Sequence, residues 1–402
     1  MRTVLAVLIF VATYAVVAAG RVPGLRIDRA GAAFLGGVLM VAAGALSLDQ
    51  AYAAIDFDTV ALLLGMMIVV ANLRLAGFFA LVTAFVVGRA RHPLQILAGV
   101  VLTSGVLSAF LVNDTICLVL TPLVLDIVLH LRRDPVPYVL AIALASNIGS
   151  TATITGNPQN MIIGSLSHIA YGDFAASLAP VAALGLLLAF LLIALLWRSE
   201  FAWHLRLAAT PPPIRIHGAL IAKSLVVVAG LVAAFFAGVR PAEAALVAGA
   251  LLLPSRAVKV GRMYADIDWT LLLMFAGLFV VVAGIERTLL TPEAVRRLAV
   301  LHLNDMPVLG VATALLSNLV SNVPAVLVLK PFITGLADPQ RAWKVVAMAA
   351  TLAGNFTLLG SVANLIVVQR ARARGVAIGF WSYFAVGAPL TALSILAGLA
   401  LL

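Results

Sequence analysis

The stretch SNIGSTATITGNPQN, residues 146–160, consists mainly of small and polar residues inside a strongly apolar chain. Hydrophobic residues make up 63% of the 402 residues, and charged residues only 10%. Gly149, Gly156 and Pro158 oppose a continuous helix here, because glycine lowers helix propensity and proline lacks an N–H donor. An interrupted helix leaves backbone N–H and C=O groups without helical partners. The stretch therefore predicts a broken helix whose free polar groups serve another purpose.

The composition places this break inside a membrane protein. Mean hydropathy is +1.15, and apolar runs of transmembrane length recur from residue 4 to residue 402. We therefore predict an all-α polytopic membrane protein in contact with lipid. The net charge of +10 does not indicate nucleic-acid binding, because the basic residues fall in short loops between the apolar runs.

The residue content excludes several chemistries. Cys117 is the only cysteine, so neither an internal disulfide nor a cysteine-based metal site is expected. No Walker motif occurs, the six His residues are scattered, and no Ser/His or paired-Asp constellation lies within the spans. We therefore predict that the protein is not an enzyme and holds neither a cofactor nor a metal.

The basic residues predict the orientation. Most of the 26 Lys and Arg share one side if the loops with Arg89, Arg132 and Arg370 are cytoplasmic. Both termini then lie on the periplasmic side of a bacterial inner (plasma) membrane. The N-terminal run partly resembles a signal peptide, but the apolar stretch at 30–48 favours a first transmembrane helix.

The chain divides into two similar halves, 1–197 and 218–402, joined by a polar cytoplasmic linker at 198–217. IDFDTVALLLGMMIVVA at 55–71 matches IDWTLLLMFAGLFVVVA at 267–283. The predicted orientation runs these two segments through the membrane in opposite directions. The halves are therefore predicted to be inverted repeats.

Each half also carries a predicted hairpin and a predicted broken helix, in the same order. SAFLVNDTICLVLTP and SNLVSNVPAVLVLKP mark re-entrant hairpins, one around 93–131 on the inner side and one around 306–336 on the outer side. SNIGSTATITGNPQN and ATLAGNFTLLGSVAN mark broken helices at 136–169 and 342–369. Inverted repeats with interrupted helices are typical of secondary transporters, which bind solute near the midplane where the breaks meet.

Hydroxyl and amide side chains of both halves are the predicted solute ligands, because such groups both donate and accept hydrogen bonds. The substrate-binding candidates are Asn113, Ser150, Thr151, Thr153, Asn160, Ser321, Asn322, Asn355, Thr357 and Asn364. The helix breaks are assigned to Gly149, Gly156, Pro158, Gly354 and Gly360. The alternative is that the hydroxyls only bond back to their own helices or join neighbouring helices.

Asp114 is the predicted coupling residue. It lies in a long stretch of low charge, and intramembrane carboxylates usually mark ion or proton pathways. It could hold Na⁺ or exchange a proton between transport states. The alternative is a hairpin tip that reaches water and uses Asp114 as a helix cap.

LSAFLVNDTICLVLTPLVL followed by ASNIGSTATITGNPQNMIIG resembles the ion-transporter superfamily, most closely its arsenite-permease and citrate-transporter-like branch. The resemblance implies a scaffold and a mobile transport unit in each half. In the dicarboxylate symporters of this superfamily, each hairpin tip carries a Ser-Asn-Thr signature that holds substrate carboxylates and Na⁺. Here the first tip reads Val112-Asn113-Asp114 and the second Ser321-Asn322-Val323, so only the Asn residues and Ser321 carry over.

A negative charge at Asp114 disfavours an anionic substrate and suits a neutral solute such as As(OH)₃, or a cation. We therefore expect a proton-coupled arsenite or antimonite efflux permease that works by alternating access. A Na⁺- or H⁺-coupled carrier of di- or tricarboxylates, a Na⁺/H⁺ antiporter, and a membrane subunit without transport of its own are the alternatives. A homodimer and a cytosolic ATPase partner are left open.

Overall fold

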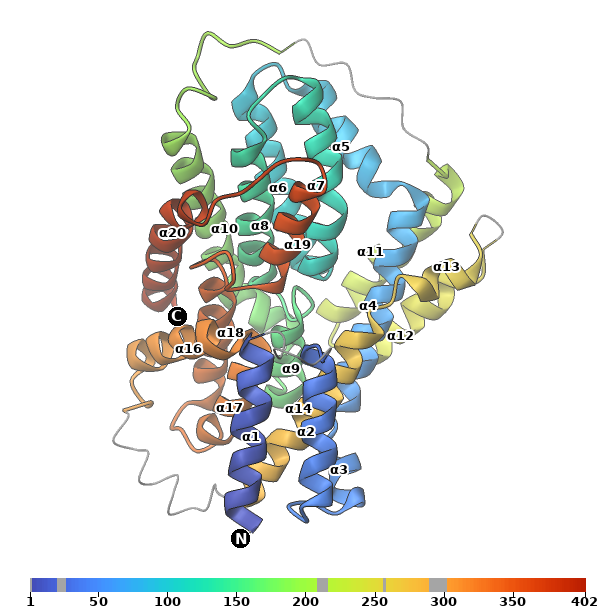
Figure 1. Cartoon of the computed structure of the whole chain (residues 1–402). Coiled ribbons are helices and arrows are strands. Elements are labelled where there is room, and N and C mark those ends of the chain that lie inside the picture. The colour runs from blue at the N-terminus through green and yellow to red at the C-terminus, as the bar shows by residue number, and fades with distance from the viewer. Residues whose placement is uncertain (1, 20–26, 208–215, 256–257, 289–301) are drawn as a thin grey trace.

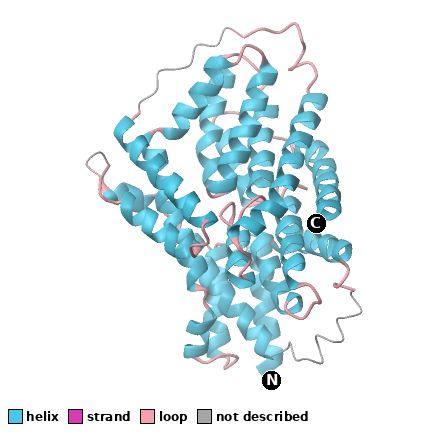
Figure 2. Ribbon diagram, turned by 180° about the vertical axis from the view of Figure 1, so that it is seen from behind, coloured by secondary structure: helices cyan, strands magenta, loops and turns pink. Residues whose placement is uncertain are grey.

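The computed structural model describes residues 2–19, 27–207, 216–255, 258–288 and 302–402. Every regular element in these ranges is a helix, as Figures 1 and 2 show. Within the described residues, eight helices are long and apolar enough to cross a membrane: α1, α4, α6, α7, α10, α11, α14 and α20. Their outward faces carry large exposed apolar side chains such as Leu102, Val226 and Leu396, which suit lipid rather than water. The predicted all-α polytopic membrane fold is confirmed.

The first half contributes ten helices to the described structure. They are α1 (Arg2–Ala19), α2 (Arg29–Ala42), α3 (Leu48–Ala54), α4 (Phe57–Ala76), α5 (Phe78–Arg89), α6 (Pro93–Phe110), α7 (Asn113–His130), α8 (Pro135–Ser150), α9 (Pro158–Ser167) and α10 (Tyr171–Leu196). The predicted hairpin at 93–131 is the pair α6–α7, which turns at Leu111 and Val112. The predicted broken helix at 136–169 is α8 and α9, separated by residues 151–157.

The second half repeats this order. Its described helices are α11 (Gly218–Phe236), α12 (Pro241–Leu252), α13 (Val260–Ala265), α14 (Trp269–Thr288), α16 (Met306–Val320), α17 (Asn322–Ile333), α18 (Pro339–Ala353), α19 (Val362–Arg372) and α20 (Phe380–Leu401). The predicted hairpin at 306–336 is α16–α17, with its turn at Ser321. The predicted broken helix at 342–369 is α18 and α19.

Helices of each half pack on helices of the other half, an arrangement that we call crosswise packing. The helix α2 packs along α14 of the other half, and α12 packs along α4. The closest approach repeats as well, because a Cβ at Gly65 would overlap the backbone of Ala245, and a Cβ at Gly277 would overlap that of Ala33. In Figure 1, α4 rises from α3 toward α5, whereas α14 descends from α13. The two repeats therefore interlock, and their equivalent helices run in opposite directions.

The linker predicted at 198–217 lies partly outside the described residues, because 208–215 are not described. Its first part is anchored to the body of the first half. Glu200 accepts hydrogen bonds from Arg133 Nε at 2.8 Å and from the Tyr138 hydroxyl at 2.9 Å. These bonds fix the path of the chain after α10, in the first part of the linker between the two halves.

Candidate functional site

The first helix break is held open by its own amide side chains. Asn157 caps α9 by accepting from the backbone N–H of Asn160 at 2.9 Å. The Asn160 amide donates to the carbonyls of Ser150 at 3.1 Å and Thr153 at 3.0 Å. Gly156 lies so close to Ser150 that a Cβ would overlap its backbone. Side chains thus take the place of the missing helical donors.

The second helix break repeats this construction. The Asn364 amide donates to the carbonyls of Gly354 at 2.7 Å and Thr357 at 3.2 Å. Gly360 is packed against the Gly354 carbonyl, as Gly156 is against that of Ser150. The two breaks are therefore structural equivalents and not only similar in sequence.

Two side chains connect the breaks across the halves. Asn147 of α8 donates to Asn355 Oδ1 at 2.9 Å and to Asn364 Oδ1 at 3.0 Å, and it accepts from the Ser361 hydroxyl at 3.2 Å. Its counterpart Thr351 of α18 accepts from the Asn157 amide at 3.2 Å. Buried amides of this kind need every partner, because an unpaired polar group in an apolar interior is costly. The network fixes one break relative to the other.

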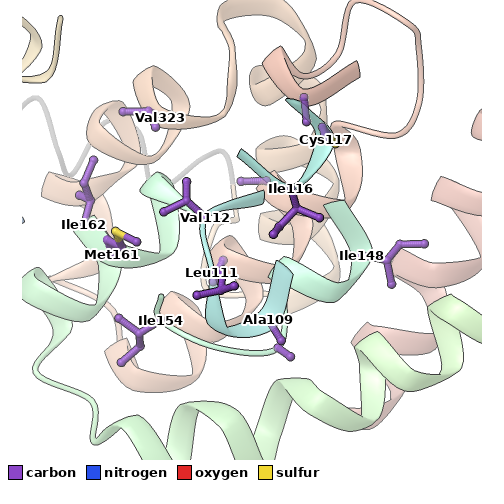
Figure 3. Packing of buried hydrophobic residues seen from close by; sticks show 14 of the residues in the cluster. Ala109, Leu111, Val112, Ile116, Cys117, Ile148, Ile154, Met161, Ile162 and Val323 are labelled. Atoms are coloured by element: carbon purple, nitrogen blue, oxygen red, sulfur yellow. The ribbon is translucent and has the colours of Figure 1, made fainter. Parts of the chain in front are cut away.

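The first hairpin tip meets the first break directly. The Asn113 backbone N–H donates to the Gly156 carbonyl at 3.0 Å, and the Asn113 amide donates to Asn147 Oδ1 at 3.1 Å. Figure 3 shows Leu111, Val112 and Ile116 of the tip among buried apolar side chains of the break and α9. The tip is thus held rigidly, with Asn113 at its polar end.

The second tip is held by different contacts. The Ser317 hydroxyl lies within hydrogen-bond distance of two acceptors, Asn322 Oδ1 at 2.7 Å and the Ala350 carbonyl at 3.1 Å. Ser321 forms the turn with φ at +80°, a conformation that residues other than glycine rarely adopt. Such strain persists only where the surroundings impose it, and it is often found at binding sites.

A cavity of about 330 Å³ lies where the two tips and the two breaks meet. Its polar lining comes from Asp28, Arg29, Asn113, Asp114, Gln159, Asp268, Thr270, Ser321, Asn322 and Ser361. The mouth is formed by the exposed residues Asp28 and Asp268, and the floor by the buried residues Asn113, Gln159 and Ser361. We call this space the tip cavity.

The tip cavity carries an excess of negative charge and one free acceptor. Asp28, Asp114 and Asp268 oppose the single cation Arg29 among the lining residues. Asn113 is 4% exposed, and its buried Oδ1 has no hydrogen-bond partner within the described residues. Among those residues no three His, Cys, Asp or Glu side chains are grouped so that they could hold a metal ion.

The structure divides the predicted site residues into two sets. Asn113, Asp114, Pro158, Ser321 and Asn322 line the tip cavity. The others lie behind its wall, where they form the two breaks: Gly149, Ser150, Thr151, Thr153, Gly156, Asn160, Gly354, Asn355, Thr357, Gly360 and Asn364. The Ser150 and Thr151 hydroxyls donate to the Asn147 carbonyl, and that of Thr153 to the Ala109 carbonyl.

Several residues of the tip cavity were not among the sequence-based candidates. Gln159 lies within the quoted stretch, and Ser361 is the counterpart of Asn157, so the repeat itself could have pointed to both. Arg29 and Asp268 come from the starts of α2 and α14, which only the tertiary packing brings to the tips.

Inverted repeats with equivalent helix breaks around a central polar cavity define a membrane transporter. Residues 7–353 match the sequence profile of a family described as citrate transporter. The chain belongs to this citrate transporter family and is therefore a transporter and not an enzyme.

Individual relatives agree with the family. An uncharacterized transporter of Mycobacterium tuberculosis is 32% identical, over 98% of this chain and 96% of its own. The silicon efflux transporter LSI3 of rice (Oryza sativa subsp. japonica) is 29% identical, over 92% and 91%. The putative transporter arsB of Dictyostelium discoideum is 24% identical, over 93% and 87%.

A solved structure shares the fold. The crystal structure of the YdaH transporter of Alcanivorax borkumensis superposes with a TM-score of 0.60, over 99% of this chain and 96% of that one, at 17% sequence identity. The likeness supports the helical membrane architecture over nearly the whole chain.

Proposed function

We propose that the protein exports a small uncharged hydroxide, arsenite or antimonite, from the bacterial cytoplasm across the inner membrane. Alternating access would expose the tip cavity to one side and then to the other, in exchange for protons. The observation that carries the proposal is the lining of the tip cavity, which combines neutral hydrogen-bonding groups with an excess of carboxylates.

The hydrogen-bonding groups suit a solute that carries hydroxyl groups. Asn113 Oδ1 offers a buried acceptor that no described residue satisfies, and a solute O–H would satisfy it. The amide of Gln159 and the hydroxyl of Ser361 lie on the same floor. As(OH)₃ presents three hydroxyls at close spacing and can donate and accept at once.

The charges disfavour a polycarboxylate. Citrate would carry its negative charges into a space that already holds Asp28, Asp114 and Asp268, with only Arg29 to oppose them. Like charges at short range repel. A neutral hydroxide avoids this repulsion.

Asp114 is the proposed proton carrier. It stands at the start of α7, one residue after Asn113, and no hydrogen bond or ion pair holds its side chain within the described residues. A carboxyl group so placed can take up a proton in one state and release it in the other.

The names of two relatives agree with this substrate class. One is a silicon efflux transporter and the other a putative arsB transporter. Silicon and trivalent arsenic both exist near neutral pH as uncharged hydroxides. The family's description as citrate transporter, together with Arg29 in the tip cavity, favours a Na⁺- or H⁺-coupled carboxylate carrier as the second candidate.

Everted membrane vesicles from cells that express the protein test the proposal. We expect ATP-independent accumulation of arsenite or antimonite that responds to a pH gradient and not to Na⁺. Citrate and succinate serve as the competing substrates. Carboxylate uptake without arsenite uptake would refute the proposed substrate and support the second candidate.

A further inference from the structure

A second cavity, of about 360 Å³, lies between the start of α4, the helix α9, the start of α10 and the turn from α11 to α12. Its mouth includes the exposed residues Asp58 at the start of α4 and Arg240 just before α12, which form an ion pair at 2.9 Å. Its deep end is formed by the buried residues Ile154, Met161 and Tyr171. We call it the outer cavity, because the predicted orientation places the start of α4 outside.

The two cavities are related by the repeat. Asp58 and Leu62 of the outer cavity correspond to Thr270 and Met274 of the tip cavity, by the same sequence offset that relates Gly65 to Gly277. Because equivalent helices run in opposite directions (Figure 1), the mouths at the starts of α4 and α14 face in opposite directions.

A single helix connects the two cavities. Pro158 and Gln159, at the start of α9, line the tip cavity. Met161 and Ser165, further along α9, line the outer cavity. Met161 is buried at the deep end of the outer cavity, two residues from Gln159 on the wall of the tip cavity.

Tyr171 joins these side chains to the opposite wall. Its ring stacks on Phe235 of α11 at 4.9 Å and meets Phe236 edge-on at 5.2 Å. Its hydroxyl lies 2.8 Å from that of Thr155 in the first break. Tyr171 therefore ties the break to α11, and it is only 4% exposed.

The equivalent aromatic residue of the second half is free of such packing. Phe380, at the start of α20, stacks on Phe384 of its own helix at 5.7 Å and is 44% exposed. The aromatic stack thus lies at the deep end of the outer cavity, whereas the tip cavity reaches solvent past Asp28 and Asp268.

We propose that the outer cavity is the outer end of the solute path and that Tyr171 is the gate between the outer cavity and the tip cavity. This gate is closed in this inward-open structure. The proposal rests on alternating access in the function proposed above. Outward opening then separates the Tyr171 ring from Phe235, and solute passes along α9 from the tip cavity to the outer cavity.

Cysteine labelling tests the path without any substrate. Ser165→Cys reports on the outer cavity and Val362→Cys on the tip cavity, and the native Cys117 is fully buried. With a membrane-impermeant maleimide, we expect Ser165→Cys to react from the periplasmic side and Val362→Cys from the cytoplasmic side. Reaction of both from one side would overturn the path. A failure of arsenite transport would not change this readout, so the two proposals fail separately.

The gate is tested in the Val362→Cys protein. Tyr171→Ala should raise labelling of Val362→Cys from the periplasmic side by about twofold to tenfold, the range that loss of one aromatic pair corresponds to. Phe380→Ala, which removes the equivalent ring of the other half, should leave it unchanged. An equal effect of the two substitutions, or none, would overturn the gate. If Tyr171→Ala does not fold, Phe235→Ala removes the same stack from the α11 side and must give the same increase.

Discussion

At the scale of single residues, the structure separates the groups that build the site from the groups that face the solute. The sequence could predict a polar cluster in each half, because hydroxyls and amides recur there in equivalent positions. It could not predict which of them point into the tip cavity, since that depends on which side chains form hydrogen bonds with the backbone of each break. The amides of Asn160 and Asn364 bond to the backbone in this way, whereas Asn113 Oδ1 has no hydrogen-bond partner within the described residues.

Asn147 provides the sharpest test of the network between the two breaks. Its amide bonds to Asn355 and Asn364 of the other half, so Asn147→Ala leaves buried partners unpaired at a cost of about 1–3 kcal/mol per group. We expect a lower unfolding temperature and a more than tenfold lower transport rate, measured on purified protein and in vesicles. The matched control is Thr121→Val, because among the described residues the Thr121 hydroxyl bonds only to its own helix, at the Cys117 carbonyl. Equal unfolding temperatures and transport rates of the two variants would contradict the role of Asn147 in joining the breaks.

At the scale of helices, the sequence predicted the hairpins and the broken helices close to their observed bounds, because Gly, Pro and Asn mark their turns. It did not predict that α2 would pack on α14 and α12 on α4, since apolar helix faces carry little information about their partners. This crosswise packing brings Arg29 and Asp268 to the tips, and for this reason both residues were missed as part of the site.

Gly277→Ala tests the crosswise packing. The added Cβ would overlap the Ala33 backbone and force α2 and α14 apart, at a cost of about 1–3 kcal/mol. We expect a lower unfolding temperature in detergent. Gly230→Ala in α11 is the control, because nothing lies within 4 Å of its added Cβ. An unfolding temperature of Gly277→Ala equal to that of the control would contradict the close approach.

At the scale of the whole molecule, the inverted repeat explains why one chain forms two related cavities whose mouths face in opposite directions. The similarity of the halves was readable in the sequence, and the direction of each half followed from the basic residues. The difference in packing between the two halves could not be predicted from the sequence. It depends on which of two equivalent aromatic residues, Tyr171 or Phe380, is packed against the opposite half.

Reporter fusions test the predicted orientation. Alkaline phosphatase, which is active only in the periplasm, should be active when fused after Gly238 between α11 and α12 and inactive when fused after Arg206. The reverse pattern would place the mouth of the tip cavity on the periplasmic side and that of the outer cavity on the cytoplasmic side, while leaving the fold unchanged.

The central claim is proton-driven transport of a neutral hydroxide through the tip cavity, and one measurement tests it most directly. Purified protein is placed in liposomes with an acidic lumen, and arsenite entry is followed for the native chain and for Asp114→Asn. We predict that the pH gradient drives arsenite inward through the native protein and that Asp114→Asn abolishes this dependence. Citrate entry without arsenite entry, or the same pH dependence in Asp114→Asn, would contradict the account.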